Sequence, residues 1–240
     1  MIYYNLVSFT HCFGDGLRGC PNGHPLLVSM TKLKTNVYVD GFNLYYGAVK
    51  GTPYKWLNID TLLQLMLPMA SINRIRYFTA LVNSTLSDPT KRQRQQTYIR
   101  ALETIPHLKV TYGNFMSEKK RMPLVQPLLD GTTVVEVIRT EEKGSDVNLA
   151  AYMVYDACQG EYQQAIVVSN DTDLAEAISL VHQRLRLRVG IINPRSKNTA
   201  WPLRNAATFY RSIRTGVLSA SQFPNTLSDV HGTITKPPSW

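Results

Sequence analysis

Four aspartates in this sequence stand where side chains could perform chemistry together. Asp171 and Asp173 follow a short apolar run that ends at Val168, and Asp40 ends another such run far upstream. Asp146 follows a Lys-Gly-Ser turn just before a helical pattern. Because ligands of open parallel sheets bind at the carboxyl ends of the strands, we expect these side chains to meet in one acidic cleft.

Carboxylates that lie close together raise one another's pKa and oppose folding unless a cation compensates their charge. The predicted cluster contains no cysteine or histidine, and a ligand set made only of oxygen favours Mg²⁺ or Mn²⁺ over zinc. Such an ion lowers the pKa of bound water and neutralises charge on a phosphoryl group, which is the chemistry of phosphodiester cleavage. The predicted metal ligands, which are also predicted catalytic residues, are Asp40, Asp146, Asp171 and Asp173.

Three polar residues near these aspartates are given supporting roles. Asn43 and Ser169 would orient the metal or the scissile phosphate through hydrogen bonds, and Lys143 would hold a phosphate or position the attacking water. An ordinary structural explanation also exists for the acidic residues: Asp40 would cap the next helix, and Asp146 lies in a first helical turn. Because acidic residues occur at three such segment ends, one shared functional site is favoured over three unrelated helix caps.

Strand and helix patterns alternate along the chain and would bring these residues to one edge of a sheet. The alternation predicts an α/β fold with a doubly wound, mainly parallel sheet of about five strands and helices on both faces. Residues 115–140 interrupt the pattern, and Asp130-Gly131 before a β-branched run predicts an inserted hairpin. Strands are expected at 36–39, 74–82, 108–112, 164–168 and 185–192, and helices at 59–66, 88–103, 145–158, 172–183 and 198–207.

The two ends of the sequence differ in composition from the middle. Glycine and proline are crowded in residues 1–34, which we expect to form a poorly ordered extension, with Met30 as an alternative start. Its cysteines and histidines match no common zinc spacing, so no metal is assigned there. Residues 35–215 are expected to form the domain, and residues 216–240, where serine, threonine, proline and glycine dominate, are expected to form a weakly ordered tail.

The overall charge favours a polyanionic partner, since 26 Lys and Arg outnumber 17 Asp and Glu and give a net charge of +9. Three cysteines at uneven spacing favour a reduced, cytoplasmic protein. The sequence has no run of about 18 apolar residues, so a membrane span is not expected.

Basic residues lie in the first turns of the expected helix 88–103, where the helix dipole makes positive charge unfavourable. A solvated face is the commoner explanation, and phosphate contact is the functional one. The predicted RNA-binding residues are Lys91, Arg92, Arg94, Lys143, Ser169, Arg195 and Lys197.

Three motifs carry a resemblance to a known family. They are Val-Asp-Gly-Phe-Asn-Leu-Tyr at 39–45, Lys-Gly-Ser-Asp-Val-Asn-Leu-Ala at 143–150 and Ser-Asn-Asp-Thr-Asp-Leu at 169–174. With these three motifs in this order, the chain resembles the NYN-domain proteins, which are a branch of the PIN-like nucleases. The resemblance implies a PIN-like three-layer α/β/α sandwich and metal-dependent ribonuclease activity. It matches the family's metal-site aspartates and its asparagine to Asp40, Asp146, Asp171, Asp173 and Asn43.

The expected function is cleavage of single-stranded RNA by water at a Mg²⁺ or Mn²⁺ site. One alternative is an RNA-binding or regulatory module of the same family whose acidic pocket does not turn over. A second alternative is a haloacid-dehalogenase-like phosphatase, although that family requires a second aspartate two positions after the first, and position 42 is Phe. RNA is the expected partner, and the sequence leaves open whether the chain forms a homo-oligomer.

Overall fold

The computed structural model describes residues 32–195 and 200–240. The expectations for the N-terminal extension, including the alternative start at Met30, and for Lys197 lie outside the described residues. None of the helices within these two ranges is long and apolar enough to cross a membrane.

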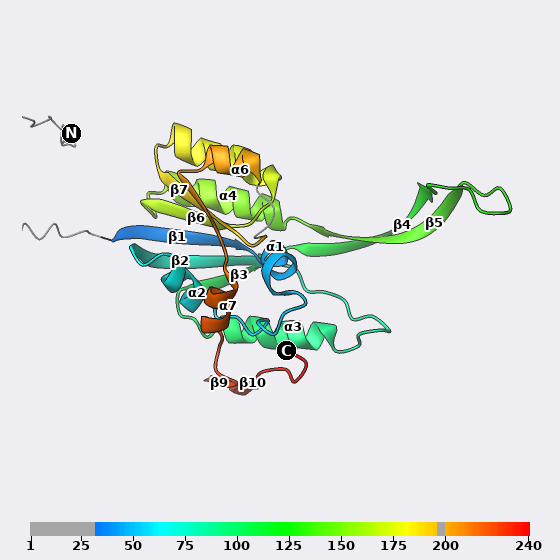
Figure 1. The fold of residues 1–240 in the computed structure, drawn as a ribbon, viewed down its shortest axis with the longest axis horizontal. Helices are drawn as coiled ribbons and strands as arrows, with labels where there is room; N and C mark the ends of the chain where they lie inside the picture. The colour runs from blue at the N-terminus through cyan, green and yellow to red at the C-terminus, as the bar shows by residue number, and fades with distance from the viewer. Residues whose placement is uncertain (1–31, 196–199) are drawn as a thin grey trace, which may run out of the picture. The chain divides into compact units, whose positions relative to one another are not determined.

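A six-stranded sheet in which every neighbouring pair is parallel forms the centre of the fold (Figure 1). The strand order is β3-β2-β1-β6-β7-β8, so the chain fills one side of the sheet outward from β1 and the other side outward from β6. The predicted parallel α/β fold is confirmed, with the short extended segment near residue 210 as a sixth strand. The strands are β1 (Leu33–Asp40), β2 (Ala70–Thr79), β3 (Leu108–Tyr112), β6 (Gln164–Val168), β7 (Arg188–Asn193) and β8 (Phe209–Ser212).

Helices cover both faces of the sheet and make the three layers that were predicted (Figure 1). Successive residues of a strand point to opposite faces, so Val37 and Val39 pack with α2 (Ile59–Met66), α3 (Lys91–Leu102) and α7 (Thr215–Ala220). Tyr38 instead packs with the helices of the other face. Those helices are α4 (Ser145–Cys158), α5 (Ala175–Ser179) and α6 (Trp201–Ala206).

Four short helical segments complete this layer structure. Two of them follow the strand ends that carry the predicted aspartates: α1 (Gly41–Leu44) follows β1, and the 3₁₀ turn η2 (Thr172–Leu174) follows β6. The π-helical turn η1 (Tyr45–Val49) continues α1, and a second π-helical turn, η3 (Leu180–Arg184), continues α5. Single π-helical turns occur frequently at functional sites.

The predicted inserted hairpin is present between β3 and α4. Strands β4 (Asn114–Pro123) and β5 (Val134–Lys143) pair antiparallel along their whole length, from Asn114 opposite Lys143 to Pro123 opposite Val134. Figure 1 shows this pair extending as an arm away from the six-stranded sheet. At the tip, the Asp130 carboxylate accepts a hydrogen bond from the Thr132 amide at 2.9 Å, in the turn that Asp130-Gly131 predicted.

The C-terminal residues do not form the weakly ordered tail that composition suggested. After α7, strands β9 (Thr226–Asp229) and β10 (Gly232–Thr235) make a second antiparallel pair. Phe223 and Ile234 are buried in the core, and the Trp240 ring lies 5.7 Å from the ring of Tyr98. A few apolar residues therefore pack this segment against the core. The average composition of residues 216–240, which is mostly polar, does not reveal them.

Candidate active site

Asp40 occupies the end of β1, beside the point where the strand order reverses direction, which is where open α/β sheets bind ligands. Its side chain is 5% exposed. One carboxylate oxygen accepts a hydrogen bond from the Asn43 amide at 2.8 Å, and the other accepts one from the Ser169 hydroxyl at 3.0 Å. Asp40 is therefore both the cap of α1, as the ordinary explanation held, and a member of the acidic cluster.

The segment after β6 is tied to the end of β1 by polar contacts. The Ser169 hydroxyl accepts a hydrogen bond from the Asp171 amide at 3.1 Å while it donates to Asp40. The Asn43 side-chain oxygen accepts a bond from the Asn170 amide at 3.1 Å. Because Ser169 is fully buried, it orients the carboxylates and does not offer the RNA contact predicted for it.

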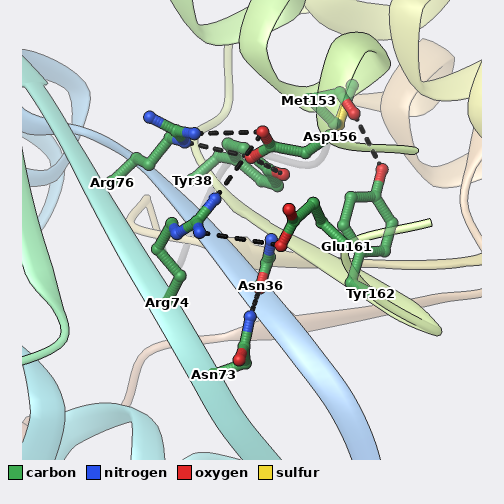
Figure 2. Close-up of polar contacts among 9 residues, drawn as sticks. All are labelled: Asn36, Tyr38, Asn73, Arg74, Arg76, Met153, Asp156, Glu161 and Tyr162. Atoms are coloured by element: carbon green, nitrogen blue, oxygen red, sulfur yellow. Dashed lines mark hydrogen bonds and ion pairs between the residues drawn. The ribbon is translucent and has the colours of Figure 1, made fainter. Parts of the chain in front are cut away.

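Helix α4 brings Asp146 to the same place from a third part of the chain. Gly144, with a φ of 96°, turns the chain from the arm into the helix, a backbone conformation that favours glycine. Ten residues further along α4, about 15 Å at 1.5 Å per residue, Asp156 is bound by Arg76 through two 3.0 Å hydrogen bonds and by the Tyr38 hydroxyl at 2.9 Å (Figure 2). This buried contact fastens α4 to the sheet and so helps to hold Asp146 at its position.

The side chains from these segments line one pocket, called the acidic pocket below. It encloses about 500 Å³ of empty space, counting the space at its mouth. Within the described ranges, none of its four carboxylates forms an ion pair. The lining residues are Asp40, Phe42, Asn43, Tyr46, Glu142, Asp146, Asp171 and Arg195.

The electrostatics of the pocket show that its carboxylates affect one another. Burial is the main cause that raises the pKa of Asp146 to about 6, and the charges of Asp40, Asp171, Glu142 and Asp173 follow as further causes. Burial also raises the pKa of Asp40, against the lowering effect of its two hydrogen bonds. A cation in the pocket would oppose the mutual repulsion and favour the charged carboxylates.

The donor set fits a hard divalent cation. All its protein ligands would be carboxylate or amide oxygens, which Mg²⁺ and Mn²⁺ prefer. Among residues 32–195 and 200–240, no three Asp, Glu, His or Cys side chains already form a metal-binding group, so the pocket is not a finished cage. Magnesium is usually held by one or two carboxylates together with water and substrate phosphate, so such a cage is not required.

Glu142 is the pocket residue that sequence reasoning missed. Its carboxylate accepts a hydrogen bond from the Ser145 amide at 3.1 Å and lines the pocket. Its neighbour Lys143, which was predicted to be catalytic, does not line the pocket, because adjacent residues of a strand point to opposite faces. The Lys143 ammonium instead lies 3.1 Å from the carboxylate of Glu141, two residues before it on the same face of β5. Had a strand been expected through residue 143, the alternation of its side chains would have placed Glu142 and Lys143 on opposite faces.

The remaining predicted residues fall in different places. Asp173 is exposed and does not line the acidic pocket, although its charge contributes to the raised pKa of Asp146. Arg195 lines the pocket, where Gly47 allows Pro194 and Arg195 to approach η1 closely: a side chain at Gly47 would come within 2.8 Å of Pro194. Lys91 and Arg94 line a second pocket, and Arg92 is exposed and lines neither.

The fold and this pocket define an α/β protein with an acidic pocket at the carboxyl ends of its central parallel strands, the edge where such sheets bind ligands. The NYN domain family matches residues 34–214, so the chain belongs to the NYN domain family, and the resemblance drawn from the sequence is confirmed. This assignment favours the two NYN interpretations over the phosphatase alternative.

A bacterial monooxygenase and a protein of unknown function are among the proteins similar to this chain. The 6-hydroxy-3-succinoylpyridine 3-monooxygenase HspA of Pseudomonas putida is 30% identical over an alignment that covers 87% of this chain and 75% of that protein. The crystal structure of VPA0982, a protein of unknown function from Vibrio parahaemolyticus, has a TM-score of 0.52 at 17% identity, covering 79% of this chain and 98% of that one. The second similarity supports the fold alone.

Proposed function

We propose that this chain is an endoribonuclease that uses Mg²⁺ or Mn²⁺ to cleave single-stranded RNA with water. The family assignment supports a PIN-like nuclease and a nucleic-acid partner. The observation that carries the proposal is the acidic pocket, in which carboxylates from three distant chain segments meet without an ion-pair partner among the described residues. Charge left unpaired in this way is available to a bound cation.

The pocket residues have different proposed roles, which follow from their chemistry. Asp40, Asp146 and Asp171 would hold the metal, with Glu142 beside them, and Arg195 at the rim would bind a phosphate of the substrate. When bound, the ion supplies a water of lowered pKa and neutralises charge on the phosphoryl group. In the reaction the oxygen of water bonds to phosphorus, the phosphorus–oxygen bond to the leaving ribose breaks, and that oxygen takes up a proton.

The test is a cleavage assay on a labelled single-stranded RNA with added Mn²⁺. Asp171→Asn should lower cleavage by roughly a hundred-fold or more, since it removes a charged ligand from the metal site. Glu103→Gln is the matched control, because Glu103 is an exposed carboxylate that lines neither pocket. Equal activity in the Asp171 variant would overturn the proposal. Binding of RNA without cleavage in either protein would support the regulatory module instead.

A second candidate is hydroxylation of a small aromatic ring, as the name of the Pseudomonas relative describes. The identity to that relative favours it, and so does an aromatic pocket next to the acidic one. A hydroxypyridine incubated with the protein, air and a reduced nicotinamide cofactor would test it. Turnover of the ring together with no cleavage of RNA would replace the nuclease proposal.

A further inference from the structure

A second pocket adjoins the acidic pocket and differs from it in chemistry. Phe42 and Tyr46 line both pockets, so the two share a wall formed by α1 and η1. The second pocket, called the aromatic pocket below, has an empty volume of about 740 Å³ when the open solvent at its mouth is counted. Its aromatic lining residues are Phe42, Tyr45, Tyr46, Tyr77, Tyr98 and Trp240.

The Tyr77 hydroxyl gives this pocket an unused hydrogen-bonding group. The residue is 6% exposed, and in the described part of the chain its hydroxyl has no hydrogen-bond partner, whereas the hydroxyl of its pocket neighbour Tyr98 donates to the Leu57 carbonyl at 2.8 Å. The hydroxyl is not among the fully buried polar atoms that lack a partner in the described residues, so it is reached from the pocket. A group of this kind is free to bond a ligand that enters the pocket.

The same hydroxyl lies close to Gly41, the residue that follows Asp40 of the acidic pocket. A side chain at Gly41, the residue after Asp40, would come within 2.7 Å of the Tyr77 hydroxyl and of the Phe78 carbonyl, so only glycine allows this approach. Burial, followed by the nearby Asp40 charge, raises the pKa of Tyr77. The hydroxyl therefore keeps its proton and is able to donate it in a hydrogen bond.

Positive side chains complete the lining. Lys55 and Lys91 line the aromatic pocket and have no ion-pair partner among the described residues, whereas Arg94 is held by Asp88 at 2.5 Å. Lys91 is the first residue of α3, where the helix dipole opposes a positive charge. Since helix stability does not account for Lys91, contact with an anion beside the aromatic rings is the better explanation.

We propose that the aromatic pocket binds one unpaired base of an RNA strand whose neighbouring phosphate lies in the acidic pocket. Aromatic rings stack on bases of any sequence, lysines bind the backbone, and a donor such as the Tyr77 hydroxyl reads a base edge. A base inside a duplex cannot enter a recess in the protein surface without leaving its stack. The inference rests on the proposed nuclease function and specifies its substrate as an unpaired nucleotide next to the cleaved bond.

The experiment measures binding without cleavage, in EDTA, by the fluorescence anisotropy of labelled six-nucleotide RNAs. Homopolymers of each base are compared with a strand of the same length that lacks all bases but keeps its phosphates. The abasic strand should bind roughly ten-fold to a hundred-fold more weakly, the loss expected for base stacking on aromatic side chains. Equal affinity for the strand without bases would overturn the proposal.

Two variants and one control variant localise the effect. Lys91→Gln should weaken binding of every strand, while Lys109→Gln, a change at an exposed lysine on β3 that lines neither pocket, should not. Tyr77→Phe keeps the ring and the fold, and should reduce the differences in affinity among the four homopolymers. Unchanged base preference in Tyr77→Phe together with equal losses in the two lysine variants would place the RNA elsewhere and overturn the inference.

The failure of this inference can be told apart from the failure of the proposed function. A protein that prefers strands with bases in EDTA but cleaves nothing in Mn²⁺ would overturn the nuclease and keep the base pocket. A protein that cleaves abasic and ordinary strands equally well would overturn the pocket and keep the nuclease. A hydroxypyridine that binds the protein tightly but does not displace bound RNA would also overturn the base pocket.

Discussion

Helix α4 carries a carboxylate near each end, and the surroundings of the two are opposite: Asp156 is buried and Asp146 is half-buried. Asp156, 1% exposed, has both oxygens bound by Arg76, with the Tyr38 hydroxyl on one of them and Arg74 at 3.8 Å (Figure 2). Asp146 lies in the acidic pocket among other carboxylates, and no described cation forms an ion pair with it. The charge of Asp156 is neutralised inside the fold, and that of Asp146 has no counter-charge among the described residues.

This contrast shows that the uncompensated charge is a property of the site and not a shortage of basic residues. The chain has nine more Lys and Arg than Asp and Glu, and it places two arginines next to Asp156. Like charges that remain close together oppose folding, and sites that give up stability in this way are usually functional. The three predictions below test each side of the comparison.

The largest effect is expected where the charges are paired. Arg76→Ala leaves Asp156 buried without its main partner, and removal of one member of a buried pair costs about 3–5 kcal/mol. Urea denaturation should therefore show a loss of unfolding free energy of that size. Arg139→Ala, which removes an exposed partner of Glu141, should change stability little. If Arg76→Ala lowered the unfolding free energy as little as Arg139→Ala, the structural role given to Asp156 would be wrong.

An intermediate effect is expected when the unpaired charges receive a cation. Mn²⁺ at a hundred times its dissociation constant stabilises a protein by about 2.7 kcal/mol, which corresponds to a rise in Tm of roughly 5–10 °C for a chain of this size. Thermal unfolding at pH 7 should show this rise, while sodium chloride of matched ionic strength should not reproduce it. The rise should be lost in Asp171→Asn. An equal rise in that variant would place the metal outside the acidic pocket.

The smallest effect concerns a single carboxylate without metal. The pKa of Asp146 is about 6 in the folded protein, against 3.8 for an ordinary aspartate, so the folded state binds more protons between these values and stability falls as pH rises from about 4 to about 6. Asp146→Asn removes this loss. In EDTA at pH 7 its Tm should exceed that of the unaltered protein by on the order of 2 °C, because the half-exposed group is screened by solvent.

The pH dependence of this difference provides the check. Below about pH 4 both states of the unaltered protein bind the proton, so the two Tm values should converge. A difference that stays constant from pH 4 to pH 7 would show that the amide acts through packing and not through charge.

Local patterns were sufficient for the parts of the site that lie at strand ends. Asp40 and Asp171 follow buried apolar runs, and parallel pairing of β1 with β6 brings such ends together. Lys143 was predicted and Glu142 was not, because a one-residue change in a strand reverses the face and the register of β5 depends on its pairing with β4. The aromatic pocket was not foreseen, since Tyr77 and Trp240 meet only through tertiary packing.

Among the described residues, the arm formed by β4 and β5 joins the six-stranded domain at its base, where Glu142 lines the acidic pocket, and its tip extends away from the sheet (Figure 1). Val125 and Leu129 at that tip are fully exposed, at 102% and 111%. The tip is thus a natural place for protein engineering. Replacement of residues 124–133 by a two-residue Asn-Gly turn would remove exposed apolar surface that promotes self-association, and would leave the end of the arm at the acidic pocket unchanged.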